Sequence, residues 1–149
     1  MKVQYKNWSN IDDTLNGIVI SDGPSARKLL ATVALCPSFV ELKREDGCKL
    51  LLGLGGDVGC AQFTPAPSAQ VHSLMAALDD GNRDELMELS IRGRRVPMSR
   101  RYCLPLHTIQ RLASDFTRFR YASRSVTWDE LDDQETVAQG REDVGTFRT

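Results

Sequence analysis

The sequence predicts a single α+β domain, in which an antiparallel sheet of about four to six strands is covered on one face by a C-terminal amphipathic helix. The length of 149 residues is that of one domain. Short apolar runs separated by glycine-containing turns fill the middle of the chain, and a longer apolar stripe of helical period follows them. One or two helices are expected before the strands.

Two N-terminal helices are predicted from their capping residues. Ser9 precedes residues 10–13, where a hydroxyl N-cap followed by acidic residues favours a short helix. Asp22-Gly23-Pro24 begins a second, stronger helix with proline in its first turn, and Pro37 ends it.

The middle of the chain has the pattern of strands joined by tight turns. Asp46-Gly47 lies between two apolar runs and is typical of a hairpin, and residues 92–95 form a second expected turn. Residues 71–78 are compatible with either a helix or a strand. The expected strands are residues 39–43, 49–54, 58–64 and 85–91.

The clearest element is a helix over residues 105–120, which begins at Pro105. Its apolar side chains recur every three or four residues and form one stripe: Leu106, Ile109, Leu112, Phe116 and Phe119. Burial of each is worth about 1.5–3 kcal/mol, so we expect all five to pack on the sheet. A short strand at 126–128 would complete a domain spanning residues 1–131, and residues 132–149 are expected to form a loose polar tail.

Composition excludes several classes of function. The net charge is −1, without the basic stripe of a general nucleic-acid binder. The four cysteines form no CxxC pair, and neither His72 nor His107 has a carboxylate or cysteine at ligand spacing, so we expect neither metal nor cofactor. The chain has no apolar run long enough for a membrane span and no signal-peptide pattern at its start, which predicts a cytoplasmic protein.

Catalytic patterns are also missing. The cluster Gly53-Leu54-Gly55-Gly56-Asp57-Val58-Gly59 has valine where the dinucleotide fingerprint needs glycine, and a strand rather than a helix is expected after it. We interpret it as a turn that requires positive φ. No nucleophile motif is present, so we expect a protein without catalytic residues. A small enzyme built around Cys60, His72 or His107 is the remaining alternative of that class.

Two stretches together resemble the first immunity-protein family of bacterial polymorphic toxin systems. The first is the apolar strand and glycine-aspartate turn at residues 50–57. The second runs from Val96-Pro97 through the late helix to Val126-Thr127-Trp128-Asp129-Glu130. Tyr121-Ala122-Ser123-Arg124 stands where the family has Gly-x-Arg-Pro. Members of this family bind and block a toxin made beside them, often a deaminase or a nuclease.

The resemblance implies an immunity protein that occludes the active site of a cognate toxin domain. A regulatory or adaptor module for another protein is the alternative. Because a nucleic-acid-directed toxin needs a basic cleft, carboxylates on turns are the predicted toxin-binding groups: Asp57, Asp79, Asp80, Asp84 and Glu85. Trp128 is expected to be structural, with its ring buried and its indole N–H bonded, rather than an interface residue.

Overall fold

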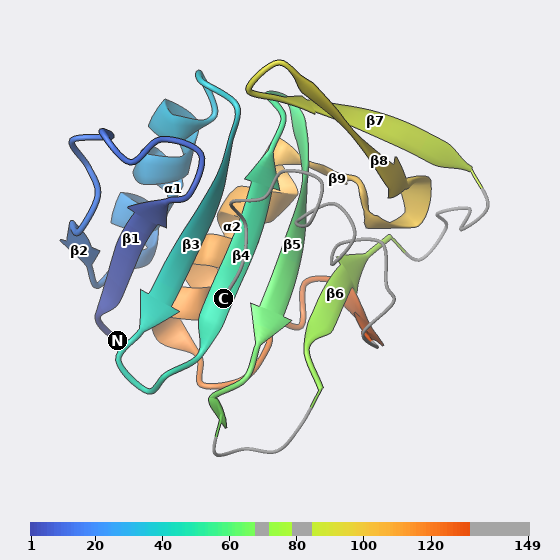
Figure 1. Ribbon diagram of the computed structural model, residues 1–149. Coiled ribbons are helices and arrows are strands. Elements are labelled where there is room, and N and C mark those ends of the chain that lie inside the picture. The colour runs from blue at the N-terminus through green and yellow to red at the C-terminus, as the bar shows by residue number, and fades with distance from the viewer. Residues whose placement is uncertain (68–71, 79–84, 132–149) are drawn as a thin grey trace.

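The computed structural model describes residues 1–67, 72–78 and 85–131, and these form an α+β domain with a large antiparallel sheet (Figure 1). The expected tail at residues 132–149 lies outside the described residues. The strands are β1 (Val3–Asn7), β2 (Val19–Ile20), β3 (Ser38–Arg44), β4 (Lys49–Leu54), β5 (Val58–Thr64), β6 (Leu74–Ala77), β7 (Leu86–Ile91), β8 (Arg94–Ser99), β9 (Leu104–Pro105) and β10 (Thr127–Glu130). The helices are α1 (Gly23–Val33), η2 (Arg100–Tyr102) and α2 (Leu106–Arg118).

The predicted fold class is confirmed, but the sheet is larger than expected. It contains eight strands in the order β10-β6-β5-β4-β3-β1-β2, with β9 paired to β5 beside this path. The strands β2 and β9 are two residues long, too short to show a period. The strand β1 does alternate, with Val3, Tyr5 and Asn7 buried, and the expectation of four to six strands overlooked this pattern.

Both faces of the central strands are covered. Figure 1 shows α1 and α2 together behind the sheet, and the β7–β8 hairpin as a separate ribbon along its upper edge. In β4, Leu50 and Leu52 belong to the larger core cluster with the helices, whereas Leu51 belongs to the cluster that includes the hairpin. The continuous apolar run of β4 therefore reflects burial on two sides.

The first of the two predicted N-terminal helices is wrong, and only α1 forms. Residues 9–17 are a loop whose amides are satisfied by side chains of neighbouring Asn and Asp residues. The Asn7 side-chain oxygen accepts from Ser9 N and Asn10 N, and Asp13 accepts from Leu15 N. Such bonds offer the backbone an alternative to the helical ladder.

The expected turns connect the central strands. Residues 44–48 join β3 to β4, and Gly55-Gly56-Asp57 joins β4 to β5, with Gly56 at φ +91°. Within the glycine cluster only Gly56 has a positive φ. The prediction that these glycines serve a turn with positive φ is therefore wrong for Gly53, Gly55 and Gly59. A Cβ on Gly59 would overlap the Gly53 carbonyl oxygen and lie 2.8 Å from the Ile109 side chain of α2. Gly59 thus permits close packing of the helix on the sheet.

The late helix forms as α2, somewhat shorter than predicted. Ile109, Leu112 and Phe116 are buried as expected, but Leu106 is half-buried and Phe119 is 50% exposed. Phe119 breaks the stripe because the helix has already ended at Arg118 and its own backbone is extended. Residues 71–78, which the sequence left open between helix and strand, contain the strand β6. This strand pairs with both β5 and β10.

Candidate functional site

The segment between α2 and β10, residues 119–126, carries the most distinctive exposed side chains of the described chain. Phe119 is 50% exposed and Tyr121 is 77% exposed. Arg118, Arg120 and Arg124 are exposed beside them. Large exposed aromatic rings and arginines are the residues enriched in binding surfaces, so the way in which the fold holds this segment matters.

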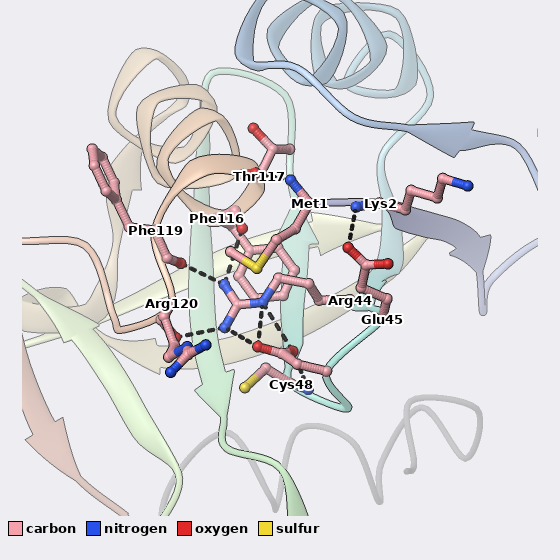
Figure 2. Close-up of polar contacts among 10 residues, drawn as sticks. Met1, Lys2, Arg44, Glu45, Cys48, Phe116, Thr117, Phe119 and Arg120 are labelled. Atoms are coloured by element: carbon pink, nitrogen blue, oxygen red, sulfur yellow. Dashed lines mark hydrogen bonds and ion pairs between the residues drawn. The ribbon is translucent and has the colours of Figure 1, made fainter.

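Arg44 binds the main chain at the beginning of this segment (Figure 2). Its side chain leaves the end of β3, is fully buried, and points at the C-terminus of α2. Nη1 donates to the carbonyl oxygens of Phe116 at 3.0 Å and Phe119 at 2.6 Å, and Nη2 donates to that of Arg120 at 2.6 Å. The guanidinium therefore caps the helix, where a positive charge is favoured by the helix dipole.

Each of the three nitrogens of the Arg44 guanidinium has an acceptor. Nε donates to the Asp46 carboxylate at 2.9 Å, and Nη2 forms an ion pair with Asp46 Oδ2 at 2.9 Å. The planar guanidinium also lies over the Phe116 ring, with 4.6 Å between Cζ and the ring centroid. The hydrogen bonds and this ion pair together compensate a charge that would be costly to bury alone.

Asp46 is held in its charged form by this cluster. Burial would raise the pKa of its carboxyl, but the hydrogen bonds from Arg44 and from Cys48 N outweigh burial and leave the pKa below its usual range. The carboxylate is therefore charged at neutral pH and neutralises Arg44. Close by, the Met1 ammonium donates to the Thr117 carbonyl at 2.7 Å, a further contact at the end of α2.

A second set of contacts fixes the far end of the segment. Asp115, on α2, accepts hydrogen bonds from the hydroxyls of Ser123 and Ser125. The Trp128 indole N–H donates to the Ser123 carbonyl at 2.6 Å, and its ring meets the Phe63 ring edge-on at 6.2 Å between centroids. The Trp128 indole N–H is bonded as expected, but the residue is half-buried against the core and not fully buried as predicted. The segment is held at both ends through its main chain and its serines.

The exposed side chains line an open hollow of about 700 Å³. We call it the arginine hollow, and its lining residues are Arg111, Asp115, Arg118, Phe119, Tyr121, Ala122, Ser123, Arg124 and Ser125. Arg111 and Arg118 are seven residues apart on α2 and so face the same side. Within the described residues no carboxylate forms an ion pair with Arg111, Arg118, Arg120 or Arg124.

A second hollow of about 810 Å³ adjoins the first and is mainly apolar. We call it the apolar hollow, and its lining residues are Asp46, Cys48, Phe63, Pro65, Ala66, His72, Leu74, Arg120, Tyr121, Ala122 and Glu130. Tyr121 and Ala122 line both hollows. The exposed residue Tyr121 therefore borders both the arginine-rich and the apolar hollow.

The predicted acidic site is only partly described. Asp57 is exposed at the β4–β5 turn, where its carbonyl accepts from Leu106 N at the start of α2. Glu85 precedes β7 and pairs with Arg100 at 2.8 Å. No recorded contact joins Asp57 to Glu85. Asp79, Asp80 and Asp84 lie outside the described residues, so the acidic group stays a prediction.

The titratable groups of the enzyme alternative do not form a reactive set. Burial raises the pKa of the Cys60 thiol to about 12 and that of Cys103 to about 11, so both are protonated and unreactive at neutral pH. His72 and His107 are exposed. In the part of the chain that the structure describes, no three His, Cys, Asp or Glu side chains gather as a metal site would require. The same part contains no helix with the length and apolarity to cross a membrane.

Sequence reasoning missed the surface after α2. Its signal is the interleaving Arg118-Phe119-Arg120-Tyr121, in which two aromatic residues alternate with two arginines just beyond an amphipathic helix. The apolar period assigns Phe119 to the buried stripe of the helix, and this assignment hides the pattern. Comparison with known proteins gives no match among protein-family models and none among curated proteins.

Proposed function

We propose that this protein is an immunity protein, which binds a cognate bacterial toxin domain in the cytoplasm of the producing cell and neutralises it by occluding its active site. The observation that carries the proposal is the rigidly held exposed segment 119–126. Its backbone is fixed by Arg44 and Trp128, while the Tyr121 side chain and half of Phe119, whose ring lies against the Arg118 guanidinium, are exposed to a partner. Exposed rings on a fixed backbone are favourable for binding because little freedom is lost when the complex forms.

The proposed mechanism is steric and needs no catalytic group on this chain. An interface of roughly 1,200–2,000 Å² would cover the mouth of a small catalytic domain. Aromatic and arginine residues near its centre would contribute most of the affinity. For a deaminase or nuclease, the acidic residues Asp57 and Glu85, with the sequence-predicted Asp79, Asp80 and Asp84, would face the basic cleft that binds nucleic acid.

Co-expression tests the proposal directly. The toxin candidate is the product of the adjacent gene, produced from an inducible promoter in a susceptible host with or without this chain. We expect growth to be restored only when this chain is present, and the two purified proteins to form a stable complex by size-exclusion chromatography. If the host dies equally with and without it, and no complex forms, the immunity function is wrong.

A regulatory or adaptor module is the second candidate, and the same exposed segment supports it. It predicts a complex with a partner that is not toxic on its own. Expressing the isolated partner therefore separates the two functions. A partner that stops growth alone supports immunity, and a harmless partner supports the adaptor.

A further inference from the structure

The two adjoining hollows differ in chemistry, and this difference specifies a ligand. We propose that they bind one segment of a partner protein, in which carboxylates lie next to a bulky apolar side chain. The carboxylates occupy the arginine hollow and the apolar side chain occupies the apolar hollow. The identity of the partner rests on the proposed immunity function. Binding of such a segment by this surface can be tested without the toxin.

Charge identifies the first half of the ligand. Arg111, Arg118 and Arg124 line the arginine hollow, and Asp115, the one carboxylate among its described lining residues, already accepts two serine hydroxyls. The net charge of the whole chain is −1, so this positive group is local. A guanidinium binds a carboxylate through two parallel hydrogen bonds, which makes three of them a specific site for Asp or Glu side chains.

Apolar lining identifies the second half. Phe63, Ala66 and Leu74 border the apolar hollow, with Pro65 and the Tyr121 ring beside them. The volume of about 810 Å³ exceeds that of any single side chain, so a leucine or phenylalanine with its backbone would fit. Burying such a side chain is worth about 1.5–3 kcal/mol.

Charge also decides which part of the ligand lies in which hollow. In the apolar hollow, Arg120 and Glu130 carry opposite charges and Asp46 is neutralised by Arg44, so this hollow offers a carboxylate no net positive charge. The acidic part of the ligand therefore lies on the side of Arg111, Arg118 and Arg124. A phosphate chain that continued into the apolar hollow would meet no group of arginines to neutralise it, so the arrangement favours an acidic peptide over a nucleic acid.

The test uses the full chain labelled with ¹⁵N and three probes: the peptide Glu-Glu-Glu-Glu-Leu-Phe, its counterpart Gln-Gln-Gln-Gln-Leu-Phe, and single-stranded dT10. We expect the acidic peptide to shift the amide signals of Arg111, residues 118–125 and Leu74. The Gln peptide should bind about tenfold more weakly. The variant Arg118→Glu/Arg124→Glu should lose the response, whereas Lys28→Glu/Lys43→Glu, which changes the net charge equally at exposed sites elsewhere, should keep it.

Three outcomes contradict the proposal: no shifts at millimolar peptide, equal binding of both peptides, or tighter binding of dT10 at the same residues. The toxin assay separates this inference from the function. If wild type and Arg118→Glu/Arg124→Glu neutralise the toxin with equal association rates, the inference fails and the immunity function stands. If the chain does not neutralise the toxin but the peptide result holds, the surface stands and the function fails.

Discussion

Arg101 and Asp129 form a two-pronged ion pair that joins η2 to the edge strand β10. Nε lies 2.8 Å from Oδ2 and Nη2 lies 3.1 Å from Oδ1, and the Tyr102 hydroxyl donates to the same carboxylate at 3.0 Å. Arg101 Nη1 also donates to the Leu78 carbonyl after β6. The ion pair therefore holds β10 in place. Trp128 lies on β10, and its indole N–H binds the Ser123 carbonyl of the exposed segment.

Breaking this pair should destabilise the protein. We expect Arg101→Met to lower the free energy of unfolding by about 2–3 kcal/mol, because a mostly buried carboxylate loses charge-assisted hydrogen bonds. Urea unfolding measures the loss. In a Trp8→Phe background, Trp128 fluorescence should also shift toward the red. An unchanged unfolding midpoint and spectrum would show that β10 does not depend on Arg101.

Removal of the Arg44 side-chain charge should be more damaging. Arg44→Met leaves Asp46 without its cation and three carbonyls at the end of α2 without donors, so we expect a loss of about 3–5 kcal/mol. Arg44→Lys should recover only part of it, since an ammonium cannot reproduce the planar array of five donors. Chemical denaturation of the three proteins checks the order, and a lysine variant as stable as wild type contradicts it.

The Asp46 carboxylate makes a pH-dependent contribution to stability. Its pKa is lowered in the folded state, so its contribution is present above the unfolded pKa of about 3.9 and is lost as pH falls through the folded pKa. We therefore expect Asp46→Asn to be less stable than wild type at pH 6, with the gap narrowing at pH 3. Urea unfolding at both pH values measures the gap, and a constant difference would refute this role.

Two phenylalanines near the end of α2 should respond very differently to truncation. Phe116 is buried between Arg44 and Phe63, and Phe116→Ala should cost about 3–5 kcal/mol. Phe119→Ala should change stability by no more than about 0.5 kcal/mol, because half of its surface already faces solvent. Thermal unfolding compares them directly. Equal losses would mean that Phe119 packs on the core after all.

The acidic group predicted from the sequence makes a separate kinetic prediction. Asp79→Lys/Asp80→Lys should slow association with a toxin that has a basic cleft and weaken the dependence of that rate on salt. Because the sequence pattern predicts solvated charges at these two positions, we expect stability to stay nearly the same. Stopped-flow association at low and high salt is the measurement. An unchanged rate at low salt would exclude these two residues as binding groups and leave the acidic turn at Asp12-Asp13 and the segment that begins at Asp132.

The sequence predicted those elements that have a strong local signal. The two central hairpins follow from apolar runs around Asp46-Gly47 and Gly55-Gly56, and α2 follows from its stripe. The β1 strand depends on a partner far along the chain, because Val3 pairs with Arg44. A capping pattern at Ser9 could not reveal that Asn7 and Asp13 would satisfy the loop at 9–17 instead.

The exposed surface was not predicted for a related reason. Periodicity assigned Phe119 to the core, and only the position of the last helical residue excludes it. Arg44 looked like part of a charged turn in the sequence, although it is among the most buried side chains of the molecule. Its burial depends on carbonyls more than 70 residues away, and no local pattern encodes them.

Arg44 holds Phe119 and Arg120 through their main-chain oxygens and leaves their side chains uninvolved. If the proposed surface binds a partner, recognition and stability are encoded by different residues and can evolve independently. Substitutions at 118–121 would then retarget the proposed surface while the residues beneath it keep the fold stable. A library randomised at these positions, with Arg44 and Trp128 kept, should therefore yield folded proteins of altered specificity.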